Sequence, residues 1–260
     1  MKSIGFIGMG NMAQALCSGF VKSGKISGNN IYAYAPNQEK LEANSRKFGF
    51  VPCRSLHDAT VNADVIVFAC KPYQIEDVLK EIKNDLKGKA VISIALGWNY
   101  KKFSEVLDKS TRFQFVMPNT PAMVGEGVFL FEKTNSLEKA ERDEFIEIFE
   151  SMGVVQELGD NLMGIGGALT GCGPAFIDVF MEAYADAAVK YGIQRKDAYR
   201  LFSQTVLGTA KLQLETGLHP GILKDNVCSP GGSTIRGVGA LEEFGLRNAC
   251  IKSIDAVMGY

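Results

Sequence analysis

Apolar and polar positions alternate along the first part of the chain in a way that predicts strands and helices in turn. Short apolar runs at 4–7, 30–35 and 64–69 have the length and composition of strands, and the last is continuous, as in a strand buried on both faces. Further strands are expected at 50–53, 90–95, 112–117, 128–131 and 154–158, and helices at 74–86, 100–108 and 137–151. This alternation predicts an α/β fold with a Rossmann-like, doubly wound parallel sheet.

The pattern changes after Gly159-Asp160-Asn161, beyond which only helical periodicity continues. The segment 175–191 carries apolar side chains on more than one helical face, so it must be buried on more than one side. About a hundred residues cannot enclose several such helices, and a subunit interface would cover the excess. We therefore expect a dinucleotide-binding domain at 1–160 and an all-helical substrate-binding domain at 161–260 that builds a homo-oligomer, a dimer or larger. A tight monomeric bundle is the alternative.

Composition narrows the class of protein. The 260 residues are 46% hydrophobic and 22% charged, and 28 basic against 29 acidic residues leave a net charge of -1. No basic stripe with interleaved aromatic residues occurs, which argues against nucleic-acid and anionic-membrane partners. No apolar run approaches the ~18 residues of a membrane-spanning helix. The six cysteines are scattered, without the spacing of a zinc site or a redox pair, so we expect a cytoplasmic protein without a metal.

A glycine-rich turn follows the first strand. Gly8, Gly10 and Ala13 have the spacing G-x-G-x-x-A, and Met12 and Leu16 continue at helical period. In a dinucleotide fold the first glycine permits the tight turn, the second lets a pyrophosphate approach the backbone, and the third small residue lets helix and strand pack closely. A purely structural turn is the alternative, but the position of this turn between a strand and a helix favours nucleotide binding.

The ends of two predicted strands indicate which dinucleotide binds. At 35–38, where NAD enzymes usually carry an acidic residue for the ribose diol, the chain has no carboxylate. Asn37 can serve a 2′-phosphate while it caps the next helix, and Lys40 is the nearest cation. Lys71 follows the strand at 64–69, at the sheet edge where ligands of open α/β sheets bind. We expect NADPH as the cofactor, with NADH tolerated.

A second glycine-rich segment, at 224–236, lies in the helical half. Its Pro-Gly-Gly at 230–232 forms a tight turn, and an apolar run resumes at Ile235 as a helix would. Amides of residues 232–234 would lie bare at the start of that helix and make a carboxylate site. Simple N-capping by Ser233 is an equal alternative on these residues alone.

Four motifs together resemble the pyrroline-5-carboxylate reductase family. They are Ala69-Cys-Lys-Pro72, Phe115-Val-Met-Pro-Asn-Thr-Pro-Ala122, Gly171-Cys-Gly-Pro-Ala-Phe176 and Asp225-Asn-Val-Cys-Ser-Pro-Gly-Gly-Ser-Thr-Ile-Arg-Gly-Val-Gly-Ala-Leu-Glu242. They occur in the family's order, and the resemblance covers nearly the whole chain. It implies reduction of L-1-pyrroline-5-carboxylate to L-proline by NADPH or NADH, the last step of proline biosynthesis.

The resemblance also implies roles for individual residues. The cofactor would be held by Ile7, Gly8, Met9, Gly10, Asn11, Met12, Pro36, Asn37, Ala69, Cys70, Lys71 and Pro72. The substrate would be held by Asn226, Val227, Ser229, Gly231, Gly232, Ser233 and Thr234. Thr234 would be the catalytic residue, which hydrogen-bonds the ring nitrogen directly or through water. Hydride addition to a protonated imine needs mainly proximity and orientation, so His57 and His219 are expected to be structural or surface residues.

Two other functions are compatible with the first turn. A β-hydroxyacid dehydrogenase requires a catalytic lysine at the start of its helical domain, and no lysine occurs between Lys139 and Lys190. A regulator that senses NADPH without turnover would leave the segment from Ser229 to Thr234 without a purpose. Both are weaker alternatives to the reductase.

Overall fold

The computed structural model describes residues 3–259, and the chain divides between Gly171 and Cys172 into two compact units. We call the part up to Gly171 the N-terminal unit and the part from Cys172 the helical unit. The described residues of the first form a sheet and helices, and those of the second form helices alone.

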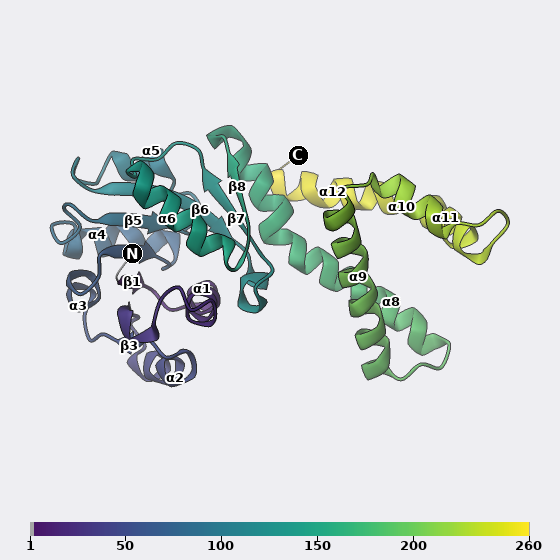
Figure 1. Ribbon diagram of the computed structural model, residues 1–260, viewed down its shortest axis with the longest axis horizontal. Coiled ribbons are helices and arrows are strands. Elements are labelled where there is room, and N and C mark those ends of the chain that lie inside the picture. The colour runs from purple at the N-terminus through teal and green to yellow at the C-terminus, as the bar shows by residue number, and fades with distance from the viewer. Residues whose placement is uncertain (1–2, 260) are drawn as a thin grey trace. The chain divides into compact units, whose positions relative to one another are not determined.

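The N-terminal unit is built on one eight-stranded sheet with the strand order β3-β2-β1-β4-β5-β6-β7-β8 (Figure 1). The strands are β1 (Ile4–Ile7), β2 (Ile31–Tyr34), β3 (Val51–Pro52), β4 (Val65–Phe68), β5 (Ala90–Ser93), β6 (Arg112–Pro118), β7 (Gly127–Glu132) and β8 (Gly153–Leu158). Neighbouring strands run parallel except β6 and β7, which pair antiparallel. The predicted α/β, Rossmann-like fold is confirmed, whereas the antiparallel pairing of β6 with β7 departs from the parallel sheet that the sequence predicts.

Helices cover both faces of this sheet. They are α1 (Asn11–Lys22), α2 (Gln38–Phe48), α3 (Leu56–Val61), α4 (Ile75–Ile82), α5 (Tyr100–Ser104), α6 (Lys139–Glu150) and α7 (Met163–Gly167). Successive strand residues point to opposite faces: Phe6 of β1 packs in the cluster that contains side chains of α1, α2 and α6, whereas Ile7 packs in the cluster with α3, α4 and α5. Two apolar cores on either side of one sheet make it doubly wound.

Two helices are shorter than the sequence predicts. The helix expected at 74–86 ends as α4 at Ile82, and the one expected at 100–108 ends as α5 at Ser104. Tighter i→i+3 backbone bonds follow in both cases, from the Asp85 amide to the Ile82 carbonyl (2.9 Å) and from the Val106 amide to the Phe103 carbonyl (3.1 Å). The apolar periodicity continues through these turns, and for that reason the sequence extends the helices too far.

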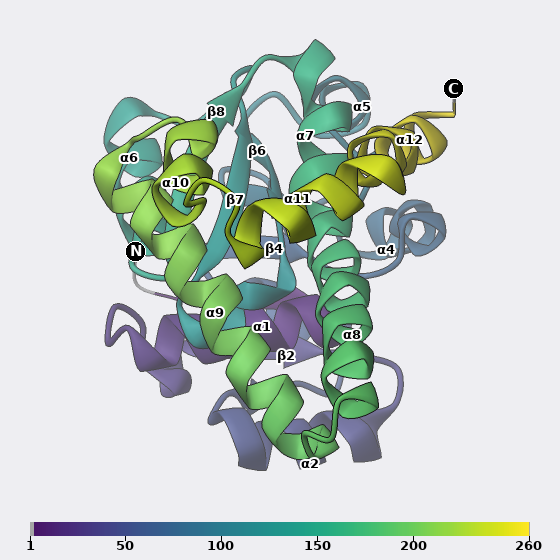
Figure 2. The same cartoon turned by 90° about the vertical axis from the view of Figure 1, so that its right-hand side faces the viewer.

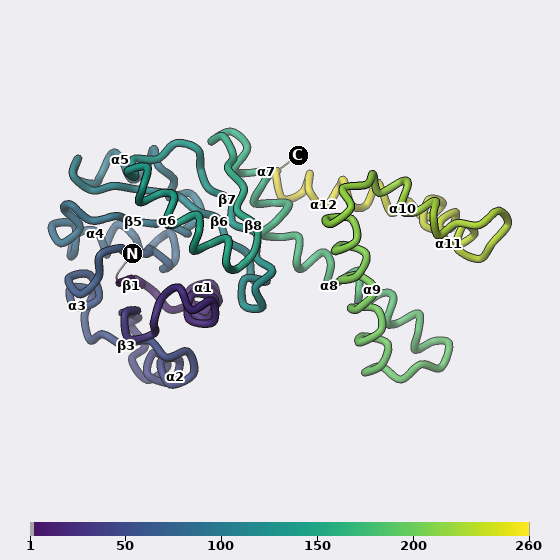
Figure 3. The backbone as a smooth tube through the Cα atoms, in the orientation of Figure 1, coloured from purple at the N-terminus to yellow at the C-terminus, as the bar shows by residue number. Residues whose placement is uncertain are grey.

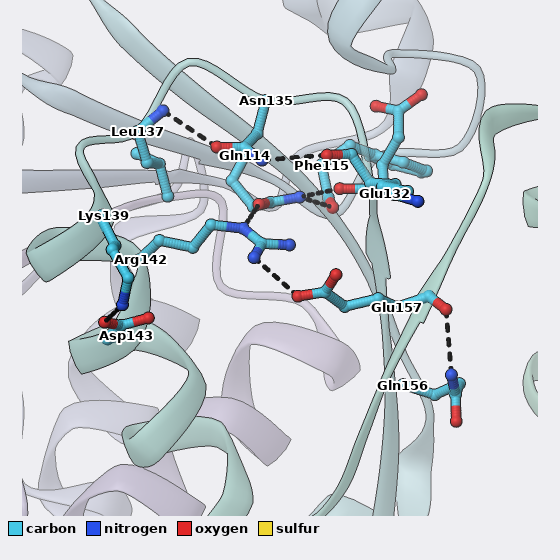
Figure 4. A network of polar contacts seen from close by, with 11 residues as sticks. Gln114, Phe115, Glu132, Asn135, Leu137, Lys139, Arg142, Asp143, Gln156 and Glu157 are labelled. Carbon is cyan, nitrogen blue, oxygen red and sulfur yellow. Dashed lines mark hydrogen bonds and ion pairs between the residues drawn. The ribbon is translucent and has the colours of Figure 1, made fainter.

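A polar network around the buried Gln114 ties the last three strands to α6 (Figure 4). The Gln114 amide on β6 donates to the Glu132 carbonyl on β7 at 2.8 Å, and its oxygen accepts from Arg142 Nε on α6 at 3.4 Å. Arg142 also forms an ion pair with Glu157 on β8, at 2.6 Å. A buried glutamine needs partners for both ends of its amide, and here those partners fix β6, β7 and α6 against one another.

The N-terminal unit extends beyond residue 160, where the sequence predicts its boundary, because β7 runs opposite to β6. Because β7 and β8 run opposite to β6, β8 finishes at the sheet edge away from the carboxyl ends of the parallel strands. Residues 160–171 then run back: α7 packs on β7, and the Thr170 carbonyl accepts a hydrogen bond from Asn119 at the end of β6. These residues belong to the N-terminal unit in the structure, whereas the sequence assigned them to the helical domain.

All described elements of the helical unit are helices, as predicted. They are α8 (Gly173–Lys190), α9 (Arg195–Thr216), α10 (Pro220–Val227), α11 (Ser233–Glu243) and α12 (Leu246–Met258). α8 and α9 form a hairpin whose helices pack against each other near their connecting loop and diverge away from it (Figure 2), and the backbone then continues through α10 to α12 (Figure 3). Among the described residues of this unit only Ala185 and Ala198 are fully buried.

Candidate functional site

A cleft of about 760 Å³ lies in the N-terminal unit where β1, β2, β4 and β5 end. Its wall includes all twelve residues that the sequence predicts for the cofactor. The other residues that line it are Tyr34, Ala35, Lys40, Leu41, Asn44, Leu56, Gln74, Val78, Ile94, Ala95, Leu96 and Thr120. This is the carboxyl edge of the parallel strands, where open α/β sheets bind ligands.

The first glycine of the turn is required by its surroundings. Gly8 has φ +100°, and a Cβ there would lie 2.7 Å from the Cys70 nitrogen and 2.8 Å from the Ala69 carbonyl oxygen. Its amide also donates to the Tyr34 carbonyl at 2.8 Å, so the ends of β1 and β2 are joined at this residue. A side chain would both strain the backbone and push the end of β4 away.

The next two positions have the local geometry that the predicted roles require. A Cβ at Gly10 would meet no protein atom within 4 Å, so the backbone here faces the cleft unscreened. Ala13 is 1% exposed and packs in the core between α1 and the sheet. Gly10 is the N-cap of α1, and no described side chain caps that helix or places an acidic group in its first turn. Free amides and an uncompensated positive helix end suit a phosphate group.

The residues that follow β2 supply polar groups to the cleft. Asn37 caps α2 as predicted, because its side-chain oxygen accepts the Lys40 amide at 2.9 Å. Lys40 and Asn44, one helical turn apart on α2, both line the cleft. Lys40 was expected here from the sequence and Asn44 was not, although the i, i+4 spacing of these two residues could have indicated it.

The end of β4 supplies the opposite wall. Lys71 lies in it beside Pro72, which begins a short 3₁₀ turn (Pro72–Gln74) ahead of α4. Burial raises the pKa of the Cys70 thiol to about 11, so this side chain is a neutral thiol near pH 7. Cys70 therefore contributes shape and contact area to the wall rather than charge.

The seven residues predicted for the substrate gather at the turn between α10 and α11 in the helical unit. Gly231 has φ +68°, and Gly232 is the N-cap of α11, with no capping hydrogen bond from a described side chain. The alternative of capping by Ser233 is therefore wrong, since Ser233 is the first helical residue. One detail of the predicted carboxylate site is also wrong: the Gly232 amide is not bare, because it donates to the Ser229 carbonyl at 3.0 Å.

The remaining amides of this turn lie at a defined helix start. Ser233 and Thr234 occupy the first turn of α11, where backbone amides have no intrahelical acceptor. Arg236 Nη1 donates to the Gly231 carbonyl at 2.9 Å, and this bond stabilises the turn. A Cβ at Gly232 would lie 2.4 Å from Ser229 Oγ, so the glycine permits the hydroxyl to sit against the turn.

Both histidines have structural partners. His57 Nδ1 lies 2.8 Å from Asp85 Oδ2 on the surface, and His219 Nδ1 accepts the Gly221 amide at 3.0 Å as the cap of α10. Within residues 3–259, no three His, Cys, Asp or Glu side chains gather as a possible metal site.

Comparison with known proteins matches two parts of the chain to separate families and the chain as a whole to one. The family model for pyrroline-5-carboxylate reductase dimerisation matches residues 160–259, and that for NADP oxidoreductase, coenzyme F420-dependent, matches residues 3–97. The pyrroline-5-carboxylate reductase of Treponema pallidum (strain Nichols) is 38% identical over 260 residues, which cover 98% of both chains. That of Escherichia coli (strain K12) is 38% identical over 258 residues, which cover 99% of this chain and 96% of the other.

A solved structure agrees with these relatives. The crystal structure of Plasmodium falciparum pyrroline carboxylate reductase with NADP bound has a TM-score of 0.89 and 32% sequence identity, and the match covers 98% of this chain and 95% of that one.

Proposed function

The chain belongs to the pyrroline-5-carboxylate reductase family and is an oxidoreductase of proline biosynthesis, and we propose that it uses NADPH in preference to NADH to reduce L-1-pyrroline-5-carboxylate to L-proline. The family match supports the reductase against the two alternatives, a β-hydroxyacid dehydrogenase and a non-catalytic sensor. The residues that would carry out this reaction belong to the cleft of the N-terminal unit and to the turn before α11.

The charge of the cleft supports NADPH. Its wall contains two lysines, Lys40 and Lys71, and no aspartate or glutamate among the residues that line it. A ribose diol is usually bound by an acidic residue after β2, whereas a 2′-phosphate requires that position to be free of negative charge. Lys40 and Asn44 lie at that position beyond Pro36-Asn37, and they would hold the 2′-phosphate.

The twelve residues predicted for the cofactor would bind its other parts. The amides at the start of α1 would hold the pyrophosphate, and the wall from Ala69 to Pro72 would hold the nicotinamide half. When bound, the cofactor supplies a hydride to the imine carbon. The protein's part is to fix the orientation of the two reactants, which alone accounts for much of the acceleration in such a reaction.

The turn before α11 is proposed as the substrate site. Amides of Ser233 and Thr234 would bind the substrate carboxylate, and the Thr234 hydroxyl, directly or through water, would donate a hydrogen bond to the lone pair of the neutral imine nitrogen before that nitrogen gains its proton. Binding the carboxylate at a helix start fixes which face of the ring is presented. Asn226, Val227, Ser229, Gly231 and Gly232 complete the site.

The helical unit is proposed as the interface between copies of the chain. Large apolar side chains on its surface include Val179 (66% exposed), Leu201 (52%) and Leu214 (74%), and exposed apolar area on this scale marks an interaction surface. The dimerisation match spans the same residues. A homo-oligomer in the cytoplasm, with neither nucleic acid nor membrane as partner, is the arrangement that we propose.

One helical stretch, Asp160–Lys190, has the length and composition to cross a membrane, with mean hydropathy 1.3 in its most apolar window. The sequence predicted no such segment, because polar residues interrupt every continuous apolar run. Only 17% of that window is buried within the chain. We propose that a second copy covers it, since the stretch falls within the dimerisation match.

The test of this function is oxidation of NADPH by the pure protein with L-1-pyrroline-5-carboxylate present. We expect turnover to proline and a higher kcat/KM for NADPH than for NADH. Thr234→Ala should lower kcat roughly tenfold to a hundredfold and leave the Kd of NADPH unchanged. Thr205→Ala, which removes a hydroxyl bonded only to its own helix, serves as the control. An unchanged kcat in Thr234→Ala would remove this hydroxyl from the mechanism.

A further inference from the structure

One hydrogen bond joins the two loops that form the wall of the cofactor cleft at β4 and β5. The indole Nε1 of Trp98, in the loop after β5, donates to the Pro72 carbonyl, in the loop after β4, at 2.9 Å. Trp98 is 3% exposed, and its ring lies against Phe103 with centroids 5.0 Å apart and beneath Lys102 Nζ at 4.0 Å. The donor is therefore held in a fixed place by packing on both sides.

The wall that this bond supports is thin. Pro72 and Leu96 line the cofactor cleft, and the same two residues line a second hollow of about 430 Å³ together with Tyr73, Glu76, Gly97, Trp98 and Lys102. They form a partition with a hollow on either side. Leu96 is 69% exposed and Pro72 is also exposed, so core packing does not fix the partition.

We propose that Trp98 is a positioning residue for the cofactor: its indole N–H holds the Pro72 partition and so keeps Lys71 and Pro72 at the cleft. A wall without packed atoms behind it depends on directional bonds for its position. This inference rests on the proposed role of the cleft in binding the cofactor.

The chain contains one tryptophan, which permits a test confined to a single group. Biosynthetic replacement of tryptophan by benzothienylalanine keeps the shape of the ring and puts sulfur where the N–H was. Fluorotryptophan, which keeps the donor, is the matched control. We expect the sulfur analogue to raise the KM for NADPH about fivefold, as loss of one neutral hydrogen bond would, while kcat at saturating NADPH and the KM for pyrroline-5-carboxylate change less than about twofold.

Trp98→Phe provides the same test by mutation, and Lys102→Met removes the cation above the ring but keeps the indole donor. We expect the first to raise the KM for NADPH and the second to leave it unchanged. An unaltered KM for NADPH with the sulfur analogue would overturn the inference, and so would equal changes in kcat and both KM values. Lys40→Glu separates the two proposals: if it also leaves NADPH binding unchanged, the cleft itself is wrongly assigned; if it weakens binding, only the role of Trp98 fails.

Discussion

Asn119 Nδ2 donates a hydrogen bond to the Thr170 carbonyl at 3.0 Å, at a point where the regular α-helical donor is missing. In an α-helix the carbonyl of residue 170 would accept the amide of residue 174, and residue 174 is a proline without an amide hydrogen. Residues 168–172 form a π-helical turn at this point. The oxygen of Asn119 accepts the Val128 amide at 2.8 Å, so both ends of this 5%-exposed side chain are used.

Asn119→Leu should therefore lower the free energy of unfolding by about 2 kcal/mol, because it leaves a part-buried carbonyl and a part-buried amide unpaired. Urea unfolding followed by circular dichroism measures the change. Pro174→Ala restores an amide at residue 174, and in the double variant it should recover part of the loss. Strict additivity of the two substitutions would show that Asn119 does not replace the missing helix donor.

Lys40→Glu should raise the KM for NADPH roughly tenfold or more and change the KM for NADH much less, because only the former carries a 2′-phosphate. Steady-state kinetics with both cofactors measures this. Arg46→Glu makes the same change of charge on the same helix but does not line the cleft, so it should leave both KM values unchanged. Equal effects of Lys40→Glu on NADPH and NADH would place the 2′-phosphate elsewhere.

Glu132 predicts a pH dependence of stability. It lies buried at the end of β7, and one carboxylate oxygen accepts the Tyr100 amide at 2.8 Å. Burial raises the pKa of this carboxyl and outweighs the lowering effect of that bond, and Asp160 raises the pKa further. The folded protein therefore binds a proton that the unfolded chain has already lost, so this group's contribution falls as pH rises from about 4 through its raised pKa.

Glu132→Gln should remove that fall. Thermal or urea unfolding at several pH values should show the wild type losing stability relative to the variant as the pH rises. Glu126→Gln, at an exposed position, should run parallel to the wild type over the same range. A constant difference between wild type and Glu132→Gln would mean that the carboxyl titrates alike in both states.

Val179→Glu should break the association of copies, since a carboxylate in an apolar interface loses its hydration without a partner. We expect association more than about a hundredfold weaker, measured as molar mass by light scattering over a range of concentrations. Val61→Glu makes the same substitution at a 46%-exposed position on α3 and should keep the mass of the wild type. An unchanged mass for Val179→Glu would take this face of α8 out of the interface.

Site residues that lie in the turn directly after a single strand could be predicted from the sequence. Gly8, Gly10 and Ala13 lie within one turn, and Asn37 caps the helix that it precedes, so local spacing is enough to place them. The contribution of Thr120 and Leu96 could not be found in this way, because these residues follow β6 and β5 and reach the cleft of the first turn only through the pairing of β1 with β4, which are not consecutive in the chain.

The direction of a strand also could not be predicted from the pattern of apolar residues. An apolar run such as β7 has the same periodicity whichever way it points, so the reversal after β6 left no signal. The predicted boundary at residue 160 follows from the last strand, while the return of residues 160–171 to the sheet depends on the contact of Asn119 with Thr170 and on α7. At the substrate turn, the bond from Gly232 to Ser229 depends on φ at Gly231, which composition alone does not set.

The close approach at Gly8 has an evolutionary consequence. Its missing Cβ leaves room for the backbone of Ala69 and Cys70, so the turn after β1 and the loop after β4 are bound to each other before any cofactor arrives. Selection for cofactor choice can instead work at Lys40 or Asn44, which line the cleft and on which the close backbone approach at Gly8 does not depend. The geometry alone prevents a side chain at residue 8. A lineage that exchanged one nicotinamide cofactor for the other would therefore have to keep this glycine throughout.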